Sequence, residues 1–196
     1  MSELCREAFR YTALFCEENV WWAARELVDS HFDASQLQVL LFTNPNESVL
    51  MLNQRAEAGG TPIVWDYHVV LQVGRDATAS VLDFDSRLDF PVLLGAYLQN
   101  SFPDQATLPE RYQAWVRVIP AGDYLRHFFS DRSHMHGQLP ESAFPDYPII
   151  QPPAGVEAIS LADYRDTHAR LPDCSRVVPL SALFAGAEGY GGSKGM

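Results

Sequence analysis

The sequence predicts an α+β domain in which a helix packs on an antiparallel sheet. Segments with helical spacing of apolar residues are mixed along the chain with short apolar β segments bounded by turn residues. The 196 residues are 47% hydrophobic and 12% aromatic, which is enough for one full core. We therefore expect a single domain over residues 1–185, followed by a flexible glycine-rich tail over residues 186–196.

The first helix is expected over residues 17–28. Apolar residues recur there at helical spacing, and two glutamates occupy the first turn, where the helix dipole favours acids. Two short apolar segments follow, at residues 38–42 and 49–52, and a Thr-Asn-Pro-Asn turn signal lies between them. This pattern predicts a β-hairpin.

The strongest β signal covers residues 63–73, and a second covers residues 80–85. Residues 74–77, Gly-Arg-Asp-Ala, supply turn chemistry between them, which predicts an antiparallel hairpin with a short loop. Later elements are expected as a helix at 93–102, a strand at 115–119, and helices at 123–129 and 161–171, the last with Ser160 as a cap. Residues 137–153 are rich in proline, so they predict a long surface loop.

Charge and cysteine content exclude several classes of partner. The formal net charge is -11, from 25 acidic and 14 basic residues, which argues against a surface that binds nucleic acid. No apolar stretch is long enough to span a membrane, and no secretory signal is evident. Three widely spaced cysteines suit a reducing compartment, so we expect a cytoplasmic protein, and we expect it to be a monomer.

Cys16 lies at the entrance of the first predicted helix. A thiol near unpaired backbone N–H groups and the positive end of the helix dipole is stabilised as the thiolate, which is the nucleophilic form. The same N–H groups can hold the oxyanion that forms after attack on a carbonyl. The alternative is a small buried residue that packs under the helix, since cysteine is often buried.

His68 lies inside an apolar predicted strand, where a titratable side chain is unfavourable unless it is satisfied or functional. A structural histidine bonded to a neighbour is the alternative. If Val73 pairs with Thr78 across the loop, His68 lies directly opposite Asp83, with Cβ atoms about 4.5–5.5 Å apart. Asp83 can then fix the imidazole tautomer and leave the other ring nitrogen for a thiol.

The same register places Asp66 opposite Asp85. Two opposed carboxylates repel each other, so a cation is expected nearby, and Arg117 or Arg132 can supply it. The functional alternative is that the α-ammonium group of a substrate binds there, which would make the site recognise chain ends. The two histidines of His134-Met135-His136 lack an accompanying set of carboxylates or thiols, so we expect neither a metal nor a cofactor.

Four ordered motifs resemble those of the protein N-terminal glutamine amidohydrolases, also called the WDYHV-motif proteins. The motifs are Cys-Glu-Glu-Asn-Val-Trp at 16–21, Val-Trp-Asp-Tyr-His-Val-Val-Leu at 64–71, Asp-Phe-Asp at 83–85 with Phe-Pro at 90–91, and Ser-Asp-Arg-Ser-His-Met at 130–135. The resemblance covers about residues 11–185 and follows the family's order. The tail and the loop between His68 and Asp83 depart from the family pattern.

The resemblance implies a papain- or transglutaminase-like α+β fold with Cys16 as nucleophile, His68 as base and Asp83 as the orienting acid. It also implies an amidohydrolase that converts an N-terminal glutamine of a protein or peptide to glutamate and releases ammonia through a thioester. In eukaryotes this product prepares a protein for the N-degron pathway. Two alternatives remain from the residues alone: a cysteine peptidase or transglutaminase with the same triad, and a non-catalytic module that binds N-terminal residues.

Overall fold

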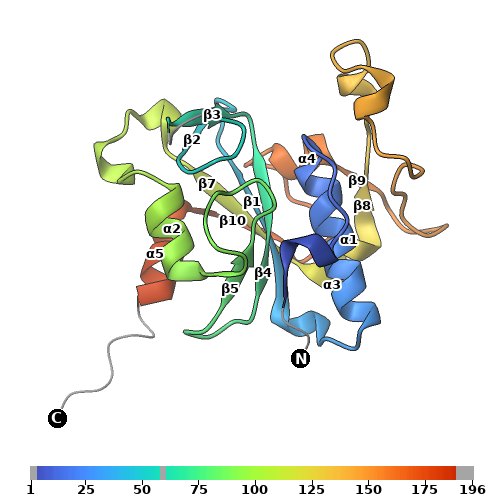
Figure 1. Cartoon of the computed structure of the whole chain (residues 1–196), viewed down its shortest axis with the longest axis horizontal. Coiled ribbons are helices and arrows are strands. Elements are labelled where there is room, and N and C mark those ends of the chain that lie inside the picture. Colours follow the sequence, from blue (N-terminus) through green and yellow to red (C-terminus); the bar gives the residue numbers. More distant parts are fainter. Residues whose placement is uncertain (1–3, 58–60, 189–196) are drawn as a thin grey trace.

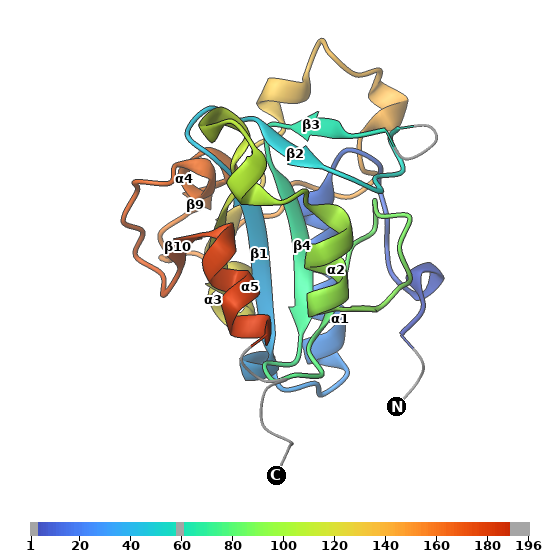
Figure 2. The ribbon, with the colours of Figure 1, turned by 90° about the vertical axis from the view of Figure 1, so that its left-hand side faces the viewer.

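A computed structural model describes residues 4–57 and 61–188 of the chain. Its centre is a six-stranded sheet with helices on both faces (Figures 1 and 2). All neighbouring strands of this sheet are antiparallel, which confirms the α+β class. In spatial order the strands are β10 (Arg176–Pro179), β7 (Trp115–Pro120), β1 (Leu37–Thr43), β4 (His68–Val73), β5 (Ser80–Leu82) and β6 (Val92–Leu93).

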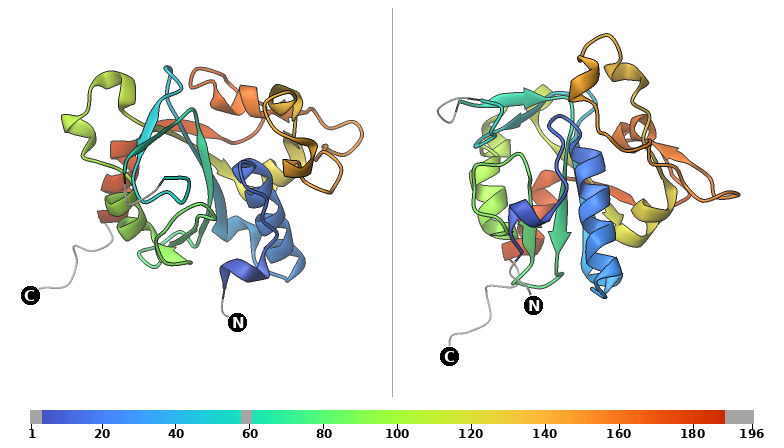
Figure 3. Two further views of the ribbon diagram at one scale, coloured as in Figure 1. Left: turned by 45° about the horizontal axis from the view of Figure 1, so that its top comes forward. Right: turned by 45° about the vertical axis from the view of Figure 1, so that its right-hand side comes forward.

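Strand alternation divides the core into two halves. On β1, Val39 and Leu41 point into one apolar cluster and Leu40 and Phe42 into the other, so both faces of the strand are buried. The first half is covered by α1 (Cys16–Asp29) and α3 (Ala121–His127), and the second by α2 (Leu94–Ser101) and α5 (Leu180–Glu188) (Figure 1). Helix α1 packs along β4 (Figure 3).

The helix predictions near both ends of the chain are largely confirmed. Helix α1 exceeds its predicted range by one residue at each end. Helix α4 (Leu161–Arg165) begins at the predicted cap, where Ser160 Oγ accepts the Asp163 N–H at 3.1 Å and Asp163 accepts the Ser160 N–H at 2.9 Å. It is shorter than predicted, because the backbone becomes extended at Asp166.

The first predicted hairpin is wrong. Strand β2 (Val49–Met51) is present, but it pairs with β3 (Ile63–Trp65) in a separate two-stranded sheet, and β1 pairs with β4 and β7. The turn signal at residues 43–46 is real, since Asn44 accepts the Asn46 and Ser48 N–H groups at 3.0 Å. The chain therefore turns as predicted but enters a different sheet.

The segment predicted as one strand over residues 63–73 is divided at Asp66 and Tyr67 into β3 and β4. The β4–β5 hairpin is antiparallel, as predicted, but its loop is longer. Val73 pairs with Ser80 rather than Thr78, which moves the register by two residues. A shift of two keeps every side chain on its predicted face of the sheet.

The later elements that the sequence predicts agree in kind, whereas strand β10 and helix α5 were not predicted. Helix α2 and strand β7 match the predicted ranges to within one residue, and α3 ends where a short parallel pair begins, β8 (Phe128–Phe129) with β9 (Ile159–Ser160). The proline-rich segment projects beside the start of α1 (Figure 3) and contains a single 3-10 turn, Glu141–Ala143, in its described residues. Helix α5 continues beyond residue 185, where the tail was expected to begin, and residues 189–196 of that tail lie outside the described residues. Within the described part of the chain, no helix is long and apolar enough to cross a membrane.

Candidate active site

Cys16 and His68 line the same cavity, which has a volume of about 500 Å³. It opens where the start of α1, the start of β4 and the turn after β5 meet. Its other lining residues come from the N-terminal segment, the β2–β3 connection, the β3–β4 junction and the segment after β8: Tyr11, Ala13, Leu14, Arg55, Ala56, Trp65, Asp66, Tyr67, Asp85, Met135 and Gln138. The mixture of apolar walls and a few convergent polar groups is typical of a small-ligand site.

The sequence predicts Cys16 at the entrance of the helix, and Cys16 is the first residue of α1. Leu14, two residues before it, has a φ of 70°, in the left-handed region that non-glycine residues rarely adopt. The chain bends at Leu14, so that Cys16 lines the cavity while Phe15, between Leu14 and Cys16, is buried in the core. The Sγ atom lies 3.6 Å from Glu17 Oε2.

The surroundings of the thiol act against the charge state that its helix position favours. Burial raises the pKa of Cys16, and the negative charges of Glu17 and Asp85 raise it further. A hydrogen bond from the Val69 backbone lowers it, but by less. Burial and two nearby acids therefore oppose the effect of the helix N-terminus, on which the sequence argument for a thiolate relied.

His68 and Asp83 form a buried pair, although not through the predicted register. The ring Nε2 lies 3.0 Å from Asp83 Oδ1, and each residue is only 2% exposed. The β4–β5 ladder ends at Leu71 opposite Leu82, so His68 and Asp83 are not directly opposed strand partners. The contact forms because Asp83 follows the end of β5, where the chain turns back toward the start of β4.

Each member of the pair favours the charged form of the other. Burial alone would lower the pKa of His68, but the Asp83 carboxylate, together with the charges of Asp85 and Glu17, outweighs burial and the pKa is raised. Burial alone would raise the pKa of Asp83, but His68 and several hydrogen bonds lower it. Those bonds come from the Asp85 N–H at 2.9 Å and the Tyr97 hydroxyl at 2.9 Å, with Gln54 Nε2 at 3.4 Å. Asp83 is thus fixed from three sides.

Asp66 and Asp85 both line the cavity but differ in surroundings. Asp85 is mostly buried and accepts the Tyr11 hydroxyl at 2.6 Å, and burial raises its pKa. The Asp66 side chain is half exposed and lies 3.5 Å from Arg165. The two are not opposed on a strand ladder, since Asp66 precedes β4 and Asp85 follows β5.

The cations proposed for these acids have other partners. Arg117 is buried and donates to the backbone oxygen of Tyr164 at 2.8 Å, at the end of α4. Arg132 forms a two-pronged pair with Glu18 at 2.6 and 2.8 Å. The prediction that Arg117 or Arg132 neutralises Asp66 and Asp85 is therefore wrong, and Arg165 is the arginine beside Asp66.

The sequence argument missed that Glu17 and Glu18 are buried, at 5% and 0% exposure. Two acids in a first helical turn are explained by the dipole alone, so nothing in the local sequence marks them as buried. Glu18 accepts from Arg132 and from the Ser130 hydroxyl, both more than a hundred positions away along the chain.

Among the described residues, no group of three His, Cys, Asp or Glu side chains is arranged to hold a metal ion.

Comparison with known proteins agrees with this geometry. A family model described as N-terminal glutamine amidase matches residues 11–184, which is most of the chain. The chain belongs to the N-terminal glutamine amidase family. Membership makes it a hydrolase that acts on an amide, the side-chain amide of an N-terminal glutamine.

Individual relatives of this amidase support the assignment. A protein N-terminal glutamine amidohydrolase from Danio rerio is 30% identical over 174 residues, which are 79% of this chain and 86% of the relative. The Homo sapiens protein of the same name is 32% identical over 165 residues, 81% of this chain and 78% of its own. One from Arabidopsis thaliana is 32% identical over 134 residues, 65% of this chain and 61% of its own.

Proposed function

We propose that this amidase hydrolyses the side-chain amide of an N-terminal glutamine through a thioester on Cys16, with His68 as general acid and base and Asp83 as the orienting acid. The observation that carries the proposal is the buried pair of His68 and Asp83 on the cavity that Cys16 also lines. We assign the fold to the papain- or transglutaminase-like group on the same basis, a cysteine at a helix start beside a histidine on a strand.

The pairing of His68 determines which ring nitrogen does the chemistry. The Asp83 carboxylate lies against Nε2 of the ring, so Nδ1 is the nitrogen that exchanges a proton with the thiol and the substrate. Asp83 also stabilises the imidazolium that forms when His68 takes the Cys16 proton. This support matters because the thiol alone, with its raised pKa, is a weak nucleophile at neutral pH.

The reaction proceeds in two steps. The Cys16 thiolate attacks the side-chain carbonyl carbon of glutamine, and backbone N–H groups at the start of α1 hold the oxyanion. His68 then protonates the amide nitrogen and the C–N bond breaks. Ammonia departs, and the acyl group remains bound to Cys16 as a thioester. Next, His68 removes a proton from water, the hydroxide attacks the thioester, and the C–S bond breaks to release glutamate and restore the thiol. The net reaction consumes one water and produces one ammonia.

Asp85, with Asp66 as a second candidate, is proposed to bind the α-ammonium group of the substrate. Asp85 is favoured because it is the more buried of the two and because Tyr11 holds its Oδ1 atom in a carboxylate that lines the cavity. The half-exposed Asp66 already has Arg165 beside it. The cavity would then select chain ends, since an internal glutamine carries no free ammonium.

Kinetics of two variants test the ammonium site. Asp85→Asn should raise the KM for a glutamine-first peptide by about tenfold or more, because a buried charged hydrogen bond is lost. Asp66→Asn should change the KM by much less. An unchanged KM in both variants would eliminate this role for either acid.

The covalent intermediate is tested by mass spectrometry. Wild-type protein mixed with a glutamine-first peptide and quenched with acid should carry the peptide on Cys16, and Cys16→Ala should carry none. Peptide attached elsewhere, or turnover by Cys16→Ala, would refute the assigned nucleophile.

The three free cysteines, Cys5, Cys16 and Cys174, suit action in the reducing cytoplasm, and we propose that the enzyme acts there as a monomer.

A further inference from the structure

Glu17 is a buried carboxyl group beside the nucleophile that the triad does not use. It is the second residue of α1 and is 5% exposed. Its Oε2 atom lies 3.6 Å from the Cys16 sulfur, which donates to it, and accepts the Tyr67 hydroxyl at 3.1 Å. Both partners line the cavity, so the carboxyl group packs against the inner side of the reaction site.

Helix α3 holds Glu17 in this position from its other side. The Tyr124 hydroxyl, which is fully buried, donates to the Glu17 backbone oxygen at 3.1 Å. The backbone at the start of α1 is therefore fixed to the core, and the side chain is fixed by Tyr67. The carboxyl group therefore cannot move away from the sulfur without breaking a buried hydrogen bond.

The titratable groups that surround Glu17 lie on helix α1, at the start of β4 and on helix α3. On α1 these are the Cys16 thiol and Glu18, and Arg132 neutralises Glu18. Tyr67 and His68 face it from the start of β4, and Tyr124 from α3. Burial raises the pKa of Glu17 to about 7, and the nearby Glu18 charge contributes to the rise, while hydrogen bonds from its own backbone, Tyr67 and Cys16 oppose it.

The Glu17 charge acts directly on the neighbouring sulfur. After burial, the Glu17 charge is the largest influence that raises the Cys16 pKa. The same charge favours protonated His68, so at and above neutral pH Glu17 disfavours the thiolate and stabilises the imidazolium.

We propose that Glu17 is a positioning residue that restrains the nucleophile: its carboxylate accepts the hydrogen bond of the Cys16 thiol and keeps the sulfur protonated in the substrate-free enzyme. This rests on the proposed function in one respect, the identity of Cys16 as the nucleophile. The restraint protects a sulfur in an open cavity from oxidation and alkylation, which act on the thiolate. It leaves proton transfer to His68 as the step that activates the sulfur.

The test is the pH dependence of Cys16 alkylation in Glu17→Gln. The amide has the size of the acid, removes the charge and offers an N–H group to the sulfur. Iodoacetamide is the probe, and peptide mapping separates Cys16 from the exposed Cys5 and Cys174. The rise of the Cys16 labelling rate with pH should move to lower pH by about one unit in the variant, which is about tenfold faster labelling at pH values below the rise. Superimposable profiles from two folded proteins would overturn the proposal.

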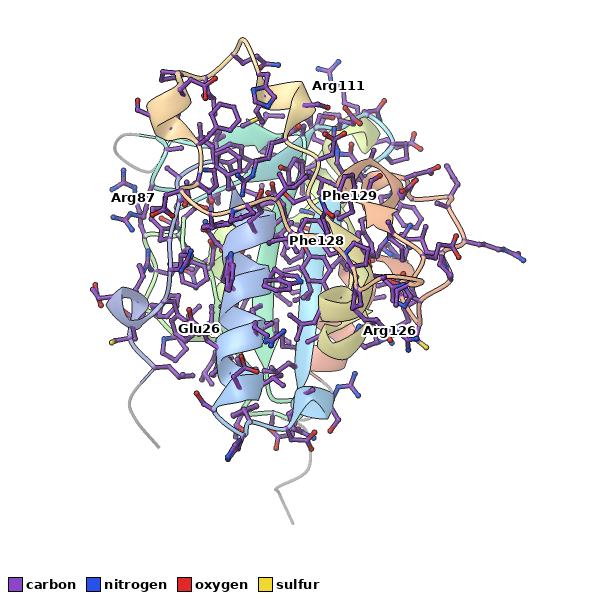
Figure 4. The ribbon with its side chains drawn as sticks, turned by 90° about the vertical axis from the view of Figure 1, so that its right-hand side faces the viewer. Glu26, Arg87, Arg111, Arg126, Phe128 and Phe129 are labelled. Atoms are coloured by element: carbon purple, nitrogen blue, oxygen red, sulfur yellow. The ribbon has the colours of Figure 1, made fainter. Side chains whose placement is uncertain are left out.

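Glu26→Gln is the matched control. It makes the same change on the same helix, and Figure 4 shows Glu26 on the half of α1 remote from Cys16. Its Cys16 profile should match that of the wild type, and an equal shift in Glu26→Gln would overturn the proposal by showing a general effect of charge on the helix.

A measurement on the unmodified enzyme covers the case in which Glu17→Gln does not fold. The thiolate absorbs in the ultraviolet and the thiol does not, so the difference between wild type and Cys16→Ala reports the state of this sulfur across pH. The proposal expects the thiolate signal only well above neutral pH, and a full signal at pH 7 would overturn it. Separately, alkylation of Cys16 should abolish ammonia release. If labelled enzyme remains active, the proposed function fails, while the shift caused by Glu17 is judged by the labelling profiles alone.

Discussion

Tyr97→Phe is the most informative single change outside the cavity. Tyr97 lies on α2, is 0% exposed, and donates its hydroxyl to Asp83 Oδ2 at 2.9 Å. Phenylalanine fills the same space without the hydroxyl, so the variant creates no apolar cavity. It leaves one oxygen of a buried carboxylate with a single weaker partner, Gln54 Nε2 at 3.4 Å.

The expected magnitudes follow from that bond. A hydrogen bond to a charged group contributes about 1.5–3 kcal/mol, so the free energy of unfolding should fall by about this amount. For a chain of this size the Tm should fall by about 3–12 °C. Because the Tyr97 hydroxyl also fixes the carboxylate that orients His68, its loss should lower kcat by about tenfold with KM little changed.

The assay combines thermal unfolding with ammonia release from a glutamine-first peptide over a range of pH. The pKa of His68 should rise in Tyr97→Phe, because Asp83 remains ionised and its carboxylate, without the Tyr97 donor, stabilises the imidazolium more. Tyr164→Phe makes the same change in a fully buried tyrosine on α4 that does not contact Asp83, and it should leave kcat and the pH profile unchanged. If Tyr97→Phe lowers only the Tm and leaves kcat and the pH profile unchanged, the reasoning is refuted.

Three further predictions concern the supporting structure. Arg132→Ala leaves Glu18 buried without its cation, and chemical denaturation should show a loss of about 3–5 kcal/mol; a loss below about 1 kcal/mol would contradict the pairing. His68→Gln should reduce the pH dependence of stability. The raised pKa of His68 adds stability that is fully present below its unfolded pKa of about 6.5 and is lost as the pH rises through the folded pKa. The wild type should therefore lose stability relative to the variant over that pH range, and parallel stability curves would refute the prediction. Ser160→Ala removes the capping box of α4 and should cost about 1 kcal/mol, with activity unchanged; a lower kcat would mean that α4 affects the site.

The sequence could predict the catalytic candidates because they depend on local rules. A cysteine at a helix start is recognised from the periodicity of the residues after it, and Cys16 is where that pattern places it. The approach of His68 to Asp83 was predicted from a register that is wrong by two residues. The contact survives because the error preserves the face of the sheet and because Asp83 lies in the turn that follows β5.

The errors concern interactions between distant segments. Strands β1 and β2 follow each other and are joined by a real turn, yet β1 pairs with β4 and β7, which no local pattern specifies. The same holds for Glu18, whose partner Arg132 lies on a segment far along the chain. Tyr97 reaches Asp83 from the far side of the sheet, so its role depends on packing that only the assembled core defines.

The central claim, that Cys16 deamidates glutamine only at a chain end, is tested most directly by ammonia release from matched peptides. The peptides are one with glutamine first, one with the same glutamine internal, and one with asparagine first, each incubated with wild type and Cys16→Ala. We predict ammonia, with conversion of the amide to an acid, from the glutamine-first peptide and wild type alone. Peptide cleavage, or equal reaction of the internal glutamine, would contradict the account in favour of a peptidase or transglutaminase, and no reaction at all would favour a module that only binds chain ends.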